Sequence, residues 1–354
     1  MKQFFQRLLT PFNSMITLTT CDMQEKKIGL GEDSDPILLQ FDKLTITGVF
    51  DGMGGAGGAE CESDFGSGYT KAYVGSRIVK AALENMIRQN PSFAFHLNFK
   101  DILLNTIGER YQEELQKYPP KSKGLRSALI KEYPTTLAIT CVREEGNKYV
   151  IDSFWAGDSR NYIWTPKGLF QISKDDLKGD LDPLQNLRDD APMSNCVHAD
   201  GKFFINHKCI EGLSTNDKFL IISATDGCFG YYPSPMDFET TLYECVKYSK
   251  NMDELKQKLS KAFAYVTADD FSYSIAAFGF GSYKELNKTF SHLSNSNVLS
   301  YFRQRKKYED LIRKRDNLLK DIEQLSNELE AHVDAIWKDY KKSYLKYVNN
   351  NEEG

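Results

Sequence analysis

The sequence predicts an α+β fold, and three observations carry this prediction. Short runs of alternating apolar and polar residues, typical of half-buried strands, dominate the first two thirds of the chain. Helical patterns stand in pairs between groups of these strands. The regular strand–helix–strand alternation of a parallel sheet is missing. We therefore expect strands that pair mostly antiparallel.

The elements are expected in the following order. A first strand is predicted at residues 14–20 and a longer one at 38–50, with a turn near Asp42. Residues 69–88 predict an amphipathic helix, and residues 99–118 a second one that ends before two prolines. Further strands are expected at 135–143, 149–155, 160–165, 169–172, 218–224 and 271–280, and further helices at 236–248 and 253–263.

The composition excludes several classes of protein. Of the 354 residues, 41% are hydrophobic and 27% charged, which is typical of a globular chain with a sizeable core. Acidic residues outnumber basic ones by 49 to 45, so the basic field of a nucleic-acid binder is missing. No apolar run reaches the roughly 18–20 residues that cross a bilayer. Seven scattered cysteines without a C-x-x-C pair indicate free thiols, so we expect a cytoplasmic protein. From the charge balance and the missing apolar run, we expect neither nucleic-acid nor membrane partners.

A composition shift near residue 283 predicts a second unit. We expect a domain over 1–283, a polar linker over 284–301 and a helical, coiled-coil-like extension over 302–354. Residues 302–348 contain no glycine or proline, and leucine and isoleucine recur there at three- and four-residue steps between charged residues. Such a helix docks on the preceding domain, pairs with a second copy of the chain, or receives another partner, and the sequence leaves these alternatives open.

The strongest local signal is Asp51, which follows an apolar strand and precedes five glycines between residues 52 and 58. A hairpin turn explains an Asp-Gly pair, but five glycines exceed the need of one turn and indicate backbone that closely approaches a ligand. Gly52, Gly54 and Gly57 also match the G-x-G-x-x-G pattern of dinucleotide sites. That pattern requires an acidic residue about 20 positions later, where a helix is expected here. Asp51 would also repel a pyrophosphate, so we reject the dinucleotide interpretation.

Acidic residues recur beside four further strands, as Glu32-Asp33, Asp158, Asp226 and Asp269-Asp270. Together with Asp51, they are expected to converge on one edge of a sheet sandwich. Like charges gathered there repel one another and raise the pKa of each carboxyl group unless cations neutralise them. Carboxylate, carbonyl and water oxygens suit Mg²⁺ or Mn²⁺ rather than Zn²⁺. The spacing therefore predicts a site for divalent cations.

The order of these residues resembles the metal-dependent serine/threonine protein phosphatases of type 2C (the PPM family) over about residues 14–281. Six motifs follow the family's order: Gly31-Glu32-Asp33, Asp51-Gly52-Met53-Gly54-Gly55, Thr135-Thr136-Leu137, Gly157-Asp158-Ser159-Arg160, Ser223-Ala224-Thr225-Asp226-Gly227 and Asp269-Asp270-Phe271-Ser272. The Asp-Gly-Met-Gly-Gly form resembles the bacterial branch. The resemblance implies a four-layer αββα sandwich of two antiparallel sheets flanked by helices.

The resemblance also implies the ligands of two or three Mn²⁺ or Mg²⁺ ions. Asp51 would bridge two ions, and the backbone carbonyl of Gly52 would bind one of them. Asp226 and Asp269 would complete the protein ligands of the first ion. Glu32 and Asp33 would hold waters or bind near the second ion. Asp158, together with Asp226, would support a third.

The activity implied by the resemblance is hydrolysis of phosphoserine and phosphothreonine in proteins. Asp51, Asp226 and Asp269 would act through a hydroxide bridged by the metal ions, which attacks phosphorus in line. The alternative is a degenerate phosphatase fold that binds phosphorylated partners through the helix at 302–348.

Three positions depart from the family's pattern. Ile28 stands where members carry an arginine that binds the substrate phosphate, and Lys27 or its neighbour Lys26 is the candidate substitute, although lysine lacks the bidentate fork of arginine. Met53 replaces a histidine of animal-type members. Residues 173–176 replace a Thr-x-Asp-His motif, which leaves the role of Asp175 open. Residues 178–208 fall where the family has its variable flap, which we expect to influence substrate choice.

Overall fold

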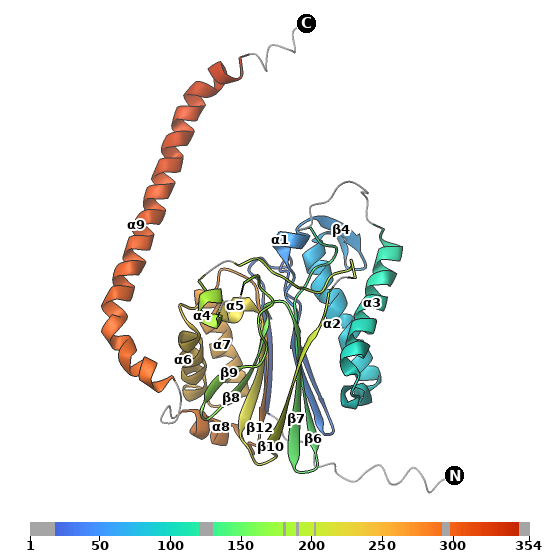
Figure 1. Cartoon of the computed structure of the whole chain (residues 1–354). Helices are drawn as coiled ribbons and strands as arrows, with labels where there is room; N and C mark the ends of the chain where they lie inside the picture. The colour runs from blue at the N-terminus through green and yellow to red at the C-terminus, as the bar shows by residue number, and fades with distance from the viewer. Residues whose placement is uncertain are drawn as a thin grey trace. The chain divides into compact units, whose positions relative to one another are not determined.

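Two five-stranded sheets lie at the centre of the computed structural model (Figure 1). The structure describes residues 18–119, 130–179, 182–188, 191–201, 203–291 and 298–346. The strand order is β1-β12-β11-β8-β9 in the first sheet and β10-β7-β6-β3-β2 in the second, and neighbouring strands pair antiparallel. The predicted α+β class with two antiparallel sheets is confirmed.

The observed strands lie close to the predicted ranges. The first sheet contains β1 (Leu18–Gln24), β12 (Phe271–Phe278), β11 (Phe219–Ala224), β8 (Arg160–Thr165) and β9 (Gly168–Gln171). The second contains β10 (Asn206–Ser214), β7 (Lys148–Ala156), β6 (Leu137–Glu145), β3 (Leu44–Val49) and β2 (Ile37–Phe41). Residues 14–17 of the first predicted strand lie outside the described residues. β10 has no counterpart among the predictions, because it is an edge strand with mostly exposed side chains and lacks apolar alternation.

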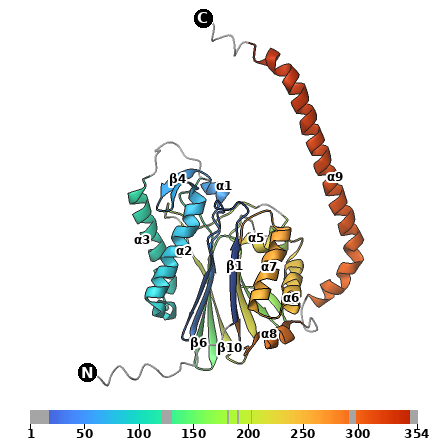
Figure 2. The same cartoon turned by 180° about the vertical axis from the view of Figure 1, so that it is seen from behind.

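Helices cover the outer faces of both sheets. α2 (Lys71–Gln89) and α3 (Phe99–Lys117) lie on the second sheet, and α6 (Pro235–Lys247) and α7 (Met252–Val266) lie on the first (Figure 1). Seen from behind, α7 lies beside the edge strand β1 (Figure 2). All four helices agree with predicted ones, and the four-layer αββα sandwich is confirmed.

Aromatic side chains fill the space between the two sheets. The rings of Phe219 and Phe278 stack with centroids 4.9 Å apart. Tyr149, from the other sheet, meets each of them edge-on at 5.4 Å. Aromatic pairs in these geometries stabilise a core beyond the area that they bury.

A buried polar network also connects the sheets. The hydroxyl groups of Thr47 in β3 and Ser223 in β11 lie 2.9 Å apart. Ser223 donates to Asn161 Oδ1 at 2.7 Å, and Asn161 Nδ2 donates to Ser153 Oγ at 2.9 Å. Because these groups are paired, they avoid the cost of burying unsatisfied polar atoms, and they restrict how the sheets slide past each other. The network precedes the acidic ends of β3 and β11, whose positions it therefore helps to set.

Several short elements have no counterpart among the predictions. They are α1 (Gly54–Gly57), β4 (Glu60–Ser63), β5 (Gly66–Thr70), the 3₁₀ turn η1 (Pro91–Phe95), α4 (Pro183–Asn186) and α5 (Asp226–Phe229). Elements of four or five residues are too short for a periodic pattern. α1, α4 and α5 lie at the same end of the sandwich (Figure 1).

The segment expected as a polar linker over 284–301 differs from the expectation in its first half. α8 (Tyr283–Phe290) forms there, with Tyr283, Leu286 and Phe290 buried and the Ser282 hydroxyl capping its first turn. Three apolar residues at three- and four-residue steps drive this helix in spite of its polar composition. Residues 292–297 lie outside the described part. Backbone contacts divide the chain into Met1–Val298 and Leu299–Gly354.

The second unit consists of α9 (Leu299–Tyr344), a helix of 46 residues. The predicted long C-terminal helix is confirmed, and it begins three residues earlier than expected. Leu318, Ile322 and Leu325 on its apolar stripe are more than half exposed. What this stripe contacts stays a prediction. Among the described residues, no helix combines the length and the apolar character needed to cross a membrane.

Candidate functional site

The backbone of Asp51 is held at the end of β3 by the residues that precede β6. The Asp51 carbonyl oxygen accepts hydrogen bonds from the Thr135 hydroxyl at 2.8 Å and from the Thr136 N–H at 2.7 Å. The Asp51 N–H donates to the Thr136 hydroxyl at 3.1 Å. Three hydrogen bonds therefore orient this one residue.

The glycines after Asp51 allow other parts of the chain to approach closely. A Cβ on Gly52 would lie 2.5 Å from the carbonyl oxygen of Ala72 and 2.6 Å from that of Glu32. A Cβ on Gly54 would collide with the Glu32 carboxyl group. The first glycines thus make room for Glu32, as well as for the start of α2, beside Asp51.

The two neighbouring carboxyl groups of Asp269 and Asp270 have different surroundings. Asp270 accepts the N–H groups of Lys26 and Glu32, both at 2.6 Å, and so holds the loop before β2. Asp269 is exposed and is the largest charge that raises the pKa of Asp226. Asp269 therefore lies beside Asp51 and Asp226, whereas Asp270 faces Asp33 and Glu32, whose pKa values its charge raises.

Asp226 begins α5 directly after β11, and its neighbours tie this turn to Asp33. The Thr225 hydroxyl donates to Asp33 Oδ2 at 2.8 Å, and Asp33 is only 2% exposed. The backbone carbonyl of Asp270 occupies the position that a Cβ on Gly227 would take, so only glycine fits there. Segments far apart in the sequence are thereby locked together.

The structure brings five predicted residues into one group, which we call the acidic cluster. It consists of Asp33, Asp51, Asp158, Asp226 and Asp269. Burial raises the pKa of Asp51 well above its usual value, and the charges of the other four raise it further. Burial followed by the Asp226 charge raises the pKa of Asp158 to about 8. The pKa of Asp33 and that of Asp226 are also raised, burial again being the largest cause.

Two further predicted residues lie outside this cluster. Glu32 stands beside it: its carboxyl group accepts the Thr70 hydroxyl at 2.6 Å, and burial raises its pKa. Lys27 lies in an exposed turn next to Ile28, which is 97% exposed. In the described part of the chain, no hydrogen bond or ion pair joins the Lys27 side chain to the acidic cluster.

The donor set fits divalent cations, although the side chains are not arranged around one. Among the described residues, no group of three or more His, Cys, Asp or Glu side chains stands in a position to hold a metal ion. The cluster nevertheless offers oxygen donors, and burial followed by neighbouring charges raises the pKa of Asp33, Asp51, Asp158 and Asp226. Asp158 Oδ1 is buried and has no hydrogen-bond partner in the described part. Oxygen donors of this kind suit Mg²⁺ or Mn²⁺.

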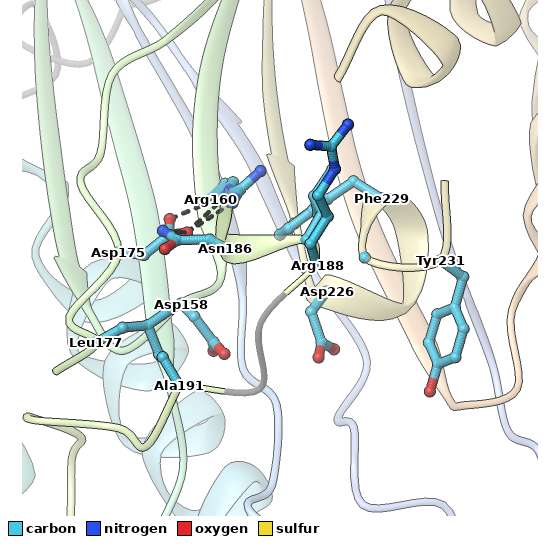
Figure 3. A pocket seen from close by; sticks show the side chains of 12 residues that line it. Asp158, Arg160, Asp175, Leu177, Asn186, Arg188, Ala191, Asp226, Phe229 and Tyr231 are labelled. Carbon is cyan, nitrogen blue, oxygen red and sulfur yellow. Dashed lines mark hydrogen bonds and ion pairs between the residues drawn. The ribbon is translucent and has the colours of Figure 1, made fainter. Parts of the chain in front are cut away.

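A cavity of about 360 Å³ opens beside the acidic cluster. Figure 3 shows the carboxyl groups of Asp158 and Asp226 within it, Tyr231 beyond Asp226, and Arg188 with its guanidinium group directed away from both carboxyl groups. The Arg188 side chain is exposed, and no hydrogen bond or ion pair holds its guanidinium group among the residues that the structure describes. The cavity therefore combines the acidic side chains of Asp158 and Asp226 with the Arg188 guanidinium group, which has neither a hydrogen bond nor an ion pair among the described residues.

Comparisons with known proteins place the fold. No family model and no curated protein matches the sequence. The serine/threonine phosphatase PstP/Ppp of Mycobacterium tuberculosis superposes with a TM-score of 0.50 at 17% identity, over 75% of this chain and 99% of that one. PppA, a regulatory component of T6SS in Pseudomonas aeruginosa, gives 0.50 at 16% identity, with the same coverage. A C. elegans sex-determining protein gives 0.52 at 16% identity, over 77% and 67% of the two chains.

The chain has the fold of the PPM-type serine/threonine phosphatases.

Asp175 and Arg160 are important residues of this PPM fold whose roles the sequence did not reveal. Arg160 Nε lies 2.9 Å from Asp175 Oδ1, and Arg160 Nη2 lies 2.6 Å from Asp175 Oδ2 (Figure 3). Both side chains are almost fully buried. Asn186 donates to Asp175 at 2.9 Å and so attaches α4, and the Arg160 guanidinium lies 4.2 Å from the centre of the Phe229 ring. The ion pair thus forms part of the wall of the cavity.

Tyr231 also lines the cavity, and the sequence did not single it out. Burial and the charges of Asp269 and Asp226 raise its pKa to about 12, so its hydroxyl group stays protonated at neutral pH. No sequence pattern distinguishes this tyrosine from the other 18. Arg160 did carry a signal, because it ends the motif that contains Asp158.

Proposed function

We propose that this chain hydrolyses phosphoserine and phosphothreonine in proteins with the help of two or three Mn²⁺ or Mg²⁺ ions. The observation that carries the proposal is the acidic cluster at the ends of strands from both sheets. Within the described part of the chain, no lysine or arginine forms an ion pair with its five carboxyl groups. Such a cluster is costly to assemble unless it binds cations.

The proposed ligands are those that the sequence suggested. Asp51, Asp226 and Asp269 would hold the first ion, Asp51 would also contact the second, and the Gly52 carbonyl would bind one of the two. Glu32 and Asp33 lie near the second, and Asp158 supports a third. When bound, the ions supply positive charge that lowers the pKa of water and stabilises the transferred phosphoryl group.

The chain's own residues keep this site in place. Thr135 and Thr136 orient Asp51, Thr225 orients Asp33, and Asp270 holds the loop that carries Glu32. Of these bonds, the one from Thr225 reaches a ligand side chain, and the others fix the backbone of Asp51 and Glu32. Hydrogen bonds to ligand side chains are worth roughly 10–100-fold in metal affinity or activity. The Tyr231 hydroxyl stays protonated and interacts with the neighbouring Asp269 carboxyl group.

Two cations are candidates for the contact with the substrate phosphate. Lys27 is the candidate from the sequence and lies in the turn before Glu32. Arg188 lines the cavity itself and offers the planar fork that binds phosphate with two hydrogen bonds. We favour Arg188, because the cavity already contains it.

The test is phosphate release from a phosphothreonine peptide. We expect turnover with Mn²⁺, none in excess EDTA, and a loss of about 100-fold or more in Asp226→Asn, since a ligand is worth at least as much as its supporting residues. Manganese binding, followed by calorimetry, should weaken in the same variant. Full activity in EDTA or in Asp226→Asn would disprove the proposal.

A phosphoprotein-binding module is the second candidate function. The exposed Ile28, in place of a phosphate-binding arginine, favours it. The helix at 302–348, by pairing with a partner or a second copy, would then be the binding element. Binding of a phosphopeptide without turnover in either metal would support this alternative.

The location of the protein stays a prediction. The seven cysteines are free, which is in keeping with the cytoplasm.

A further inference from the structure

A second cavity of about 360 Å³ lies next to the one that opens beside the acidic cluster. The two cavities share Arg160, Leu187 and Phe229 in their walls. The remaining wall comes from β8, β9, α4 and α6, with Leu169, Leu184, Met236 and Phe238 among its members. We call it the apolar cavity. It adjoins the cavity beside the acidic cluster, because Arg160, Leu187 and Phe229 line both.

The polar residues of the apolar cavity already have partners within the protein. Asp182 accepts the N–H groups of Leu184 and Gln185 at 2.8 and 3.0 Å and so caps α4. Glu239 accepts the Leu169 N–H at 3.1 Å, and Arg160 pairs with Asp175. The hydrogen-bonding capacity that the wall offers to a ligand is therefore small, and its apolar surface remains. An apolar occupant suits such a wall better than a charged one.

We propose that the apolar cavity binds an apolar side chain of the phosphoprotein substrate, at a position near the phosphorylated residue. This inference rests on the proposed function, which places the phosphate at the acidic cluster. Because the two cavities adjoin, a side chain close to the phosphorylated residue in the same substrate chain is the occupant that we propose. A volume of about 360 Å³ lies within the roughly 300–1,000 Å³ of ligand pockets and accepts a leucine or an aromatic ring.

Met236 is the best residue to change, because it lines the apolar cavity but not the other one. It stands in the first turn of α6, after the cap Ser234 and Pro235. A glutamate at such a position is favourable for the helix, so Met236→Glu should fold while it places a charge in the cavity. Met252→Glu is the matched control, because Met252 also stands in the first turn of a capped helix, directly after the cap Asn251 of α7, and lines neither cavity.

The experiment uses the full-length protein with Mn²⁺ and two kinds of substrate. An aryl phosphate reports the chemistry alone. A set of phosphothreonine peptides reports selectivity: one carries only serine and glycine around the phosphothreonine, and each of the others adds one leucine at a single position, from four residues before to four after.

We expect kcat/KM to rise about tenfold or more for leucine at one of these positions, since an apolar group in a fitting pocket is worth about 10–200-fold. Met236→Glu should abolish this preference and leave the aryl phosphate and the parent peptide within twofold. Met252→Glu should leave every value unchanged. Activity without any leucine preference, or a preference that survives Met236→Glu, would overturn the inference alone. No hydrolysis of the aryl phosphate would contradict the proposed function and the inference with it.

Discussion

At the scale of residues, the acidic cluster was predictable and its surroundings were not. Asp51 and Asp226 directly follow strands with a clear apolar pattern, and a glycine follows each of them. Position relative to a strand can be deduced from sequence, so their convergence could be expected. Asp175, Arg188 and Tyr231 stand in segments without periodicity. Their places depend on how those segments fold over the sandwich, which local sequence does not encode.

Arg188 leads to a prediction about phosphate binding. Arg188→Ala should lower kcat/KM for a phosphothreonine peptide by about 10–100-fold, because a hydrogen bond to a charged group is worth about 1.5–3 kcal/mol. Lys27→Ala should change it by less than twofold, since the Lys27 side chain is exposed in a separate turn. Steady-state kinetics of both variants measure this. A larger loss in Lys27→Ala than in Arg188→Ala would contradict the assignment.

At the scale of elements, the predictions succeeded where one face of a strand or helix is buried. α2 and α3 carry apolar residues at helical spacing and lie on the second sheet, so both were predicted. β10 is an exposed edge strand whose register shifts between Ile210 and Leu213, so its pattern is lost. α8 was hidden because its polar neighbours dominate the composition of 284–301. Burial, rather than propensity, decided which elements the sequence revealed.

α8 extends the packed domain beyond the boundary expected at residue 283. Phe290 is fully buried, and its ring lies 4.4 Å from Trp164 and 6.4 Å from Tyr243, measured between centroids. Phe290→Ala should lower the free energy of unfolding by about 3–5 kcal/mol, because it removes a large ring and leaves a cavity. Urea denaturation measures the change. A loss below 1 kcal/mol would show that α8 contributes little to the domain.

At the scale of the whole molecule, the acidic cluster brings together carboxyl groups that belong to both sheets. Asp51 follows β3 of the second sheet, Asp226 and Asp269 flank strands of the first, and Asp158 lies between β7 and β8, one from each sheet. Charge repulsion among these residues therefore acts between the layers of the sandwich. A cation bound by the cluster would replace that repulsion with attraction. Metal binding and the stability of the first unit should consequently be coupled.

This coupling predicts that Mn²⁺ raises the melting temperature of the protein. Binding to the folded state alone adds about 2.7 kcal/mol when the free ion is at 100 times its Kd, which corresponds to a rise of roughly 4–5 °C for a domain of about 300 residues. Differential scanning calorimetry with Mn²⁺ and with EDTA measures the rise.

Asp226→Asn should lose most of it, because a ligand shared between ions is missing. Phe290→Ala should melt at a lower temperature in both buffers and keep the full rise, since its defect lies away from the cluster. NaCl at equal ionic strength separates binding from general screening of charge. An equal rise in NaCl, or in Asp226→Asn, would show that the cluster does not hold the ion.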